Sequence, residues 1–310
     1  MKVVGWILLA ICLFVIIALL YYLVVGSIIF HYSLGRKTLK KRVKKKNLSK
    51  NLEKYNIDLC WWDKVPFKEV KIKSFDGLNL VGHYYDAGSR KTVCLVHGYS
   101  ANYKEMQQYA KYFYEKGYNL LCVENRAHGI SEGKVVGMGY LDRKDLLSWL
   151  EFLGDENEVV FLGLSMGASA VCCLAGEKLP KCVKGVISDC AFDNAERELS
   201  FAMRKFGKIR KLLLKHLKSY TKRLHNFDIN DADMLRFVKN TKVPILYFHG
   251  KNDTYVPYKN SQNLYNATPE NLRNLVLVDD ADHAMSYQIL GVDYERKITN
   301  FFRKYHIFDY

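Results

Sequence analysis

The apolar positions of the chain follow two different patterns, which meet near residue 66. From Val3 to Phe30 no charged residue interrupts a run of mostly Ile, Leu, Val and Tyr. A helix of about 20 apolar residues crosses the ~30 Å hydrocarbon core of a bilayer, so this run predicts a membrane span. A secretory signal peptide has an apolar region of only about 7–15 residues and a small-residue cleavage site, which this run lacks. We therefore expect an uncleaved anchor over residues 1–35, and not a buried core helix.

Beyond residue 66 the apolar residues form short runs separated by helical patterns. Residues 70–73 and 78–84 alternate in polarity around Asp76-Gly77, which predicts a β-hairpin. Continuous apolar strands alternating with helices are typical of a mostly parallel sheet covered on both faces, so the predicted class is α/β. The expected strands are Thr92–Val96, Asn119–Glu124, Glu158–Gly163, Lys184–Asp189, Pro244–His249 and Leu275–Asp279. The expected helices lie near 103–116, 139–153, 166–178, 258–267 and 292–305.

One gap in this alternation, between Asp189 and Pro244, has no strand pattern. Within it, apolar residues recur every three or four positions on one helical face, and lysines fill other positions. We expect a helical lid inserted at about 193–240 in a hydrolase domain that spans 66–310. Its basic face suits an anionic membrane surface, with a solvated helix packed on the domain as the alternative. The apolar set is Phe206, Ile209, Leu213, Leu217, Tyr220 and Leu224.

The net charge of +15 is concentrated in two segments. Residues 36–50 carry nine Lys and Arg and no acid, and residues 195–223 carry ten Lys and Arg against two Glu. Because the positive charge is confined to these two segments, it argues against a general nucleic-acid binder. We expect 36–65 to be a basic juxtamembrane linker that lies on anionic lipid headgroups. By the positive-inside rule, nine basic residues after the span against Lys2 before it place the catalytic domain of a single-pass cell-membrane protein in the cytoplasm.

The eight cysteines form no CxxC motif and have no histidine pair at zinc-finger spacing. Most lie in apolar runs, as small buried residues do in a reducing compartment. This interpretation agrees with a cytoplasmic domain. We expect neither a metal nor an organic cofactor.

The strongest candidate for chemistry is the motif Gly163-Leu164-Ser165-Met166-Gly167. It follows a predicted buried strand and precedes a small-residue helix, which is the context of a G-x-S-x-G nucleophile turn. Glycines two residues to either side of the serine let the strand and the helix approach closely. The alternative is an ordinary glycine-rich turn, which this context makes the weaker interpretation.

A serine hydroxyl needs an adjacent base, and His283 is the preferred candidate because it follows the last predicted strand. The base in turn needs a carboxylate that fixes its tautomer. Asp253 is the preferred acid and Asp189 is its rival, since both follow predicted strands. With Asp253, the chain order Ser, Asp, His is the one found with this type of nucleophile turn.

An oxyanion hole needs two N–H donors aimed at the developing negative charge. The backbone N–H of Met166, directly after the serine, is one candidate. The backbone N–H of Tyr99 is the other, because the loop His97-Gly98-Tyr99 follows the first predicted parallel strand. Gly98 lets this loop approach closely, and His97 itself is expected to be structural.

On these motifs, residues 66–305 resemble the α/β-hydrolase superfamily, and more narrowly bacterial serine hydrolases of the lid-bearing esterase or lipase type. Such proteins are sometimes labelled Ser-aminopeptidase-like or feruloyl-esterase-like. The resemblance implies an α/β-hydrolase fold with a helical lid. It also implies that Arg126 and His128 shape their loop without taking part in catalysis. The landmarks are His97-Gly98-Tyr99, the loop Arg126–Gly133, the motif around Ser165, Asp253 and His283.

The predicted function is a membrane-anchored serine hydrolase that cleaves a carboxylic ester. Ser165, Asp253 and His283 are the expected catalytic residues, and the N–H groups of Tyr99 and Met166 the expected oxyanion donors. The expected partners are a small-molecule or lipid-like ester substrate and the membrane. Peptidase, amidase or acyl thioesterase activity on the same site is an alternative, as is a binding protein on an inactive hydrolase fold. The acyl group, the leaving group and the oligomeric state stay open.

Overall fold

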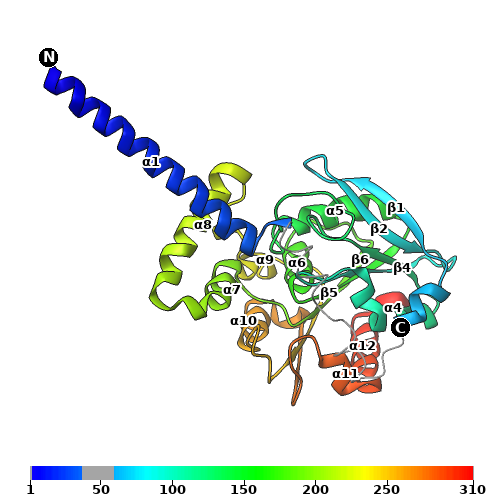
Figure 1. The fold of residues 1–310 in the computed structure, drawn as a ribbon. Coiled ribbons are helices and arrows are strands. Elements are labelled where there is room, and N and C mark those ends of the chain that lie inside the picture. The colour runs from blue at the N-terminus through cyan, green and yellow to red at the C-terminus, as the bar shows by residue number, and fades with distance from the viewer. Residues whose placement is uncertain (1, 37–58, 310) are drawn as a thin grey trace.

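A computed structural model describes residues 2–36 and 59–309 of the chain, which Figure 1 shows as a ribbon. At the centre lies an eight-stranded sheet with the order β1-β2-β4-β3-β5-β6-β7-β8. β1 and β2 form an antiparallel hairpin, β2 pairs antiparallel with β4, and β3 to β8 all run parallel. The strands are β1 Lys68–Lys73, β2 Asn79–Tyr85, β3 Lys91–Val96, β4 Asn119–Val123, β5 Glu158–Leu164, β6 Val183–Asp189, β7 Ile245–Gly250 and β8 Arg273–Val278.

Helices cover both faces of the sheet, as the sequence predicted. Side chains alternate along each strand, so Cys94 and Val96 of β3 belong to one apolar core while Val93 and Leu95 belong to the other. The first core is covered by α5 (Asp142–Leu153), α6 (Met166–Ala175), α9 (Met234–Val238) and α10 (Lys259–Ala267). The second is covered by α4 (Gln107–Glu115), α11 (Ser286–Leu290) and α12 (Val292–Tyr305). The α/β-hydrolase fold with a mostly parallel sheet is therefore confirmed.

The segment between β6 and β7 is helical, but it is not one continuous amphipathic helix. Gly207, inside η3 (Arg204–Ile209), has φ 55° and ψ −133°, which breaks the helical path two residues before η3 meets α8 (Arg210–His225). The predicted apolar stripe is divided accordingly. Leu217 and Tyr220 are buried, whereas Phe206, Ile209 and Leu224 are exposed. The insertion also contains α7 (Ala195–Ala202) and η4 (Ile229–Asp231).

The N-terminal helix α1 (Lys2–Ser33) is long and apolar enough to cross a membrane. Residues 2–21 are exposed, and the later turns of the helix pack against α8, which crosses α1 in Figure 1. The hydroxyl of Tyr22 lies 3.0 Å from Oγ of Ser219. Gly26 allows this approach, because a Cβ at that position would lie 2.2 Å from the ring of Tyr220. The last third of α1 is therefore part of the folded domain.

The residues that follow α1 pack against the loop after β4. Leu34 is fully buried, and its carbonyl accepts a hydrogen bond of 3.0 Å from the N–H of Val136. The guanidinium of Arg36 donates to the carbonyls of Gly129 and Ser131. Of the linker expected over 36–65, residues 37–58 lie outside the described residues. Its end forms the 3-10 helix η1 (Leu59–Lys64), whose two tryptophans are buried among apolar residues of the second core.

Candidate active site

Ser165 sits at a sharp turn between β5 and α6, at the edge where the parallel strands end. Its backbone has φ 55° and ψ −114°, an uncommon conformation for a residue with a side chain. The two flanking glycines are required by space. A Cβ on Gly163 would lie 2.2 Å from the carbonyl oxygen of Gly167, and one on Gly167 would lie 2.1 Å from that of Val96. This geometry lifts the Ser165 hydroxyl above the sheet edge, as the motif predicted.

The structure brings Ser165, His283 and Asp253 together in one hydrogen-bonded row. Oγ of Ser165 lies 2.9 Å from Nε2 of His283, and Nδ1 of His283 lies 2.6 Å from Oδ2 of Asp253. Because a carboxylate only accepts, Nδ1 carries the proton and Nε2 is left to accept from the serine hydroxyl. The three side chains come from the loops after β5, β7 and β8, which open on the same edge.

Asp253 is buried and accepts hydrogen bonds from several sides. Its Oδ1 accepts from the backbone N–H groups of Tyr255 and Val256, both at 2.8 Å. Burial alone would raise the pKa of Asp253, but the hydrogen bonds from His249, His283 and the Val256 N–H outweigh it and hold that pKa well below its usual range. The carboxylate is therefore charged at neutral pH, as an acid that orients an imidazole must be.

His249 is a second histidine in contact with Asp253, and the sequence interpretation assigned it no role. Its Nε2 lies 2.8 Å from the carbonyl oxygen of Val256 and 3.2 Å from Oδ2 of Asp253, so Nε2 is the protonated nitrogen. Its Nδ1 accepts from the hydroxyl of Ser261 at 2.6 Å. His249 thus donates to the oxygen of Asp253 that also faces His283. The only sequence signal for this was a histidine at the end of a strand.

The carboxylate of Asp189, the rival acid, is bound by other side chains. It is fully buried, and its carboxylate accepts from the hydroxyls of Tyr109, Tyr294 and Ser286 at 3.1, 3.0 and 2.9 Å. Burial raises the pKa of this carboxyl. Its backbone carbonyl accepts from the N–H of Ser165 at 2.8 Å, so the residue supports the serine turn through its backbone while its carboxylate is bound by the three hydroxyls.

The two expected oxyanion donors flank the serine. Met166 is the first residue of α6, where helix geometry leaves an N–H without an intrahelical acceptor. Gly98 brings the loop after β3 against the turn, since a Cβ there would lie 3.2 Å from Cβ of Ser165. Next to it, the hydroxyl of Tyr99 donates to the carbonyl of Ser33 at 2.6 Å. The loop that carries this candidate donor is therefore tied to the end of α1.

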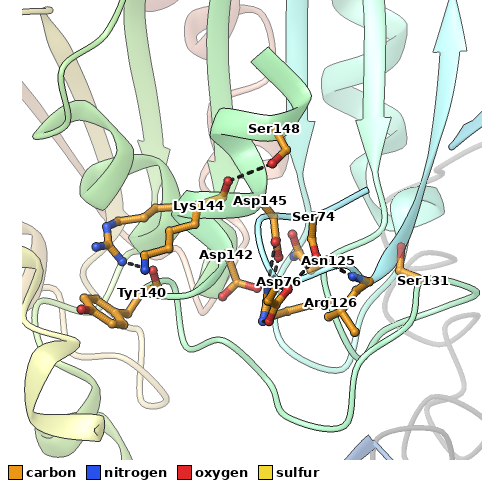
Figure 2. A network of polar contacts seen from close by, with 12 residues as sticks. Ser74, Asp76, Asn125, Arg126, Ser131, Tyr140, Asp142, Lys144, Asp145 and Ser148 are labelled. Carbon is orange, nitrogen blue, oxygen red and sulfur yellow. Dashed lines mark hydrogen bonds and ion pairs between the residues drawn. The ribbon is translucent and has the colours of Figure 1, made fainter. Parts of the chain in front are cut away.

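The loop that begins at Arg126 is held by two ion pairs of this buried arginine, one with the buried Asp145 and one with the exposed Asp76. Figure 2 shows the Arg126 guanidinium between Asp76 and Asp145, with distances of 3.0 Å and 2.6 Å to their carboxylates. In the same loop, Nε2 of His128 accepts from the N–H of Ser100 at 3.3 Å. Burial lowers the pKa of His128 to about 4, so it is neutral. These contacts shape the loop beside the site.

Glu198 of α7 is a half-buried acid to which the sequence interpretation assigned no role. Burial raises the pKa of Glu198 to about 7, while its interaction with His283 works in the opposite direction and that with Asp253 in the same one. In the sequence Glu198 was one of two acids in a basic segment, with no signal for its direction.

One cluster among the described residues has metal-ligand side chains within reach of one another. The ligand atoms of Cys190, Asp253 and His283 all lie within 4.8 Å. Burial raises the pKa of the Cys190 thiol well above its usual range, so the thiolate that a metal needs is disfavoured. The other two residues are already bonded to each other. The cluster suits proton transfer better than metal binding.

The sheet order, the helices on both faces and the serine turn define the α/β-hydrolase superfamily, to which the chain belongs. Within it, the chain is similar to the family described as Serine aminopeptidase, S33, whose model matches residues 87–240. That range contains Ser165 and both oxyanion candidates and ends before Asp253.

Three similar proteins are each 24% identical to this chain over the aligned residues. It is 24% identical over 236 residues to the uncharacterized protein YqkD of Bacillus subtilis (strain 168), covering 74% of this chain and 77% of that protein. It is 24% identical over 230 residues to a carboxylesterase of the same organism, covering 69% and 90%. The solved Pyrococcus furiosus esterase Pf2001 superposes with a TM-score of 0.64 at 24% identity, covering 79% of this chain and 94% of that one. This last likeness shows the shared fold.

Proposed function

We propose that the chain is a serine hydrolase that cleaves a carboxylic ester with Ser165, His283 and Asp253. The observation that carries the proposal is the hydrogen-bonded row at 2.9 and 2.6 Å, which starts at a strained serine turn and ends at a buried carboxylate. A serine is a weak nucleophile until a positioned base takes its proton. In this geometry Nε2 of His283 is that base.

The proposed reaction has two halves. As Oγ of Ser165 attacks the acyl carbon, Nε2 of His283 takes the serine proton, and Asp253 stabilises the imidazolium. The N–H groups of Tyr99 and Met166 stabilise the oxyanion. His283 then gives its proton to the leaving alcohol, and an acyl-enzyme remains on Ser165. Water activated by His283 releases the acid and restores the serine.

The ester is preferred as substrate because two of the similar proteins are called a carboxylesterase and an esterase. The test is turnover by the full chain in detergent on p-nitrophenyl esters of increasing chain length, with p-nitroanilides in parallel. We expect hydrolysis of at least one ester, and its loss in Ser165→Ala. Cleavage of anilides alone would favour a peptidase, and turnover of neither class would favour a binding protein.

We also propose that α1 anchors this hydrolase in the cell membrane with the catalytic domain in the cytoplasm. Residues 2–21 are exposed, and twenty helical residues at ~1.5 Å each match a hydrocarbon core of ~30 Å. Nine basic residues follow over 36–50. The test is extraction with alkaline carbonate and protease digestion of intact and lysed cells. Extraction, or loss of α1 from the mature protein, would refute the anchor, and digestion in intact cells would refute the orientation.

A further inference from the structure

The insertion exposes large apolar side chains where it approaches α1. Ile209, the last residue of η3, is 62% exposed, Leu212 in the first turn of α8 is 65% exposed, and Phe206 of η3 is 41% exposed. Single exposed apolar residues are common on protein surfaces, but these three lie within seven positions of one another. They are interleaved with basic residues, namely Lys205, Lys208, Arg210, Lys211 and Lys215.

Contacts with α1 fix the direction in which this apolar face points. His216 donates from Nε2 to the carbonyl of Tyr22 at 3.0 Å, and Ser219 lies against the Tyr22 hydroxyl. Residues three, four and seven positions apart share one side of a helix, so Ile209 and Leu212 lie on the side of α8 that carries His216 and Ser219. Tyr22 is the first residue of α1 that is not exposed. This side of α8 therefore faces α1 at Tyr22, next to the exposed residues 2–21.

Three lysines at the end of η3 and the start of α8 form no ion pair with an acid in the described part of the chain. Lys208, Lys211 and Lys215 are exposed and form no ion pair within residues 2–36 and 59–309. Later along the helix, Lys218 pairs with Glu196 and Lys222 with Asp228. A helix with exposed apolar residues bordered by lysines is suited to the headgroup region of an anionic bilayer.

We propose that this face of η3 and α8, which we call the lipid-contact face (Phe206, Ile209 and Leu212 with Lys208, Lys211 and Lys215), inserts into the headgroup region of the bilayer that α1 enters. The inference rests on the proposed membrane anchoring. Figure 1 shows α8 lying across α1. When α1 spans the bilayer, α8 therefore lies along the surface of the bilayer. The same insertion follows directly on β6, whose last residue, Asp189, accepts at its carbonyl from the N–H of Ser165 at 2.8 Å. The site is thereby held against the membrane surface, which favours an amphiphilic ester presented by lipid.

The test places a fluorophore at chosen depths in the full chain, reconstituted in vesicles of phosphatidylcholine and phosphatidylglycerol. The environment-sensitive label NBD is attached to Leu212→Cys, to Leu13→Cys in α1, or to Val292→Cys on α12. Val292 is 76% exposed and matches Leu212 as an exposed aliphatic residue far from α1 in Figure 1. Cys12→Ala and Cys60→Ser remove two native cysteines, and the others are buried. Quenching by lipids with a spin label in the headgroup or deep in the acyl chain reports the depth.

We expect the Leu212 label to be quenched by the headgroup spin label, the Leu13 label by the deep one, and the Val292 label by neither. A quenched Leu13 label with a Leu212 label that behaves like Val292 would overturn the lipid-contact face and leave the anchor intact. Absence of quenching at Leu13 would overturn the anchor and the inference together. Hydrolysis by Ser165 is not needed for any of these signals, so failure of the proposed chemistry is distinguishable.

A charge variant tests the functional consequence. Changing Lys208, Lys211 and Lys215 to Gln should lower hydrolysis of a long-chain ester embedded in anionic vesicles by about fivefold, since the face loses its attraction to the anionic surface while α1 still anchors the chain. Hydrolysis of a short soluble ester should be unchanged. The matched control changes Lys297, Arg303 and Lys304, exposed on α12, to Gln. Equal rates for the variant and this control would overturn the role of the basic residues.

Discussion

Replacing Asp253 with Asn is a sharp test of the proposed acid, because all its contacts come from donors. Oδ2 faces Nδ1 of His283 at 2.6 Å and Nε2 of His249 at 3.2 Å, and Oδ1 faces the N–H groups of Tyr255 and Val256 at 2.8 Å. An asparagine must turn its NH2 group toward one of these pairs. The backbone N–H groups cannot become acceptors, whereas His283 can move its proton from Nδ1 to Nε2.

We therefore expect Asp253→Asn to place its NH2 group toward His283 and to stabilise the wrong tautomer. Nε2 would then carry a proton where it faces Ser165 and could not act as the base. Loss of the correct tautomer in a Ser-His-Asp system lowers kcat by about 10⁴-fold. That corresponds to about 5–6 kcal/mol in the activation free energy at ~1.4 kcal/mol per tenfold change.

The assay is kcat for the best p-nitrophenyl ester, with circular dichroism and thermal unfolding of the same sample to show that the variant is folded. Asp189→Asn is the matched control, because the Asp189 carboxylate accepts from three hydroxyl groups, while the imidazole of His283 is bonded to Asp253 and Ser165. It should lower the unfolding temperature and spare most of kcat. A folded Asp253→Asn that keeps a tenth of its kcat, or an Asp189→Asn with the larger loss of kcat, would refute the assignment.

Three further predictions follow from the surroundings of the site. Tyr99→Phe removes the hydrogen bond to Ser33 but keeps the N–H, so kcat should fall about fivefold with KM unchanged in steady-state kinetics; a rise in KM alone would contradict this. Burial raises the pKa of Glu198 to about 7 from 4.5, so the unfolded chain ionises first and the native protein loses stability as pH rises between these values. In denaturant titrations, Glu198→Gln should be more stable than the native protein by about 1–2 kcal/mol near pH 8 and little changed near pH 4. If the variant and the native protein are equally stable at both pH values, the raised pKa of Glu198 is contradicted. Gly167→Ala puts a Cβ 2.1 Å from the Val96 carbonyl, so thermal unfolding should show at least about 3 kcal/mol of destabilisation, and a wild-type melting temperature would contradict it.

The sequence could predict those parts of the fold and site that follow from local pattern. The order of strands and helices was readable because buried parallel strands are continuous apolar runs. Ser165 was readable because its turn demands glycines at fixed positions, and Asp253 and His283 because strand ends meet at one edge. Each of these inferences uses spacing along the chain and a single rule of sheet geometry.

The remaining features depend on contacts between segments far apart in the chain. His249 reads as an ordinary buried residue until Ser261 fixes its tautomer and Val256 its direction. Glu198 lies in an amphipathic segment whose rotation is set by packing, not by its own pattern. The break at Gly207 was hidden because a single glycine costs a helix only about 1 kcal/mol, so periodicity across it still predicted one helix.

The central claim is that Ser165 is an activated nucleophile, and covalent labelling by a fluorophosphonate probe tests it most directly. The full chain is incubated with the probe, and the modified residue is located by mass spectrometry. The proposed site predicts one adduct, on Ser165, which is absent in Ser165→Ala and forms far more slowly in His283→Ala. A native protein that does not react, or an adduct that persists in Ser165→Ala, would contradict the claim.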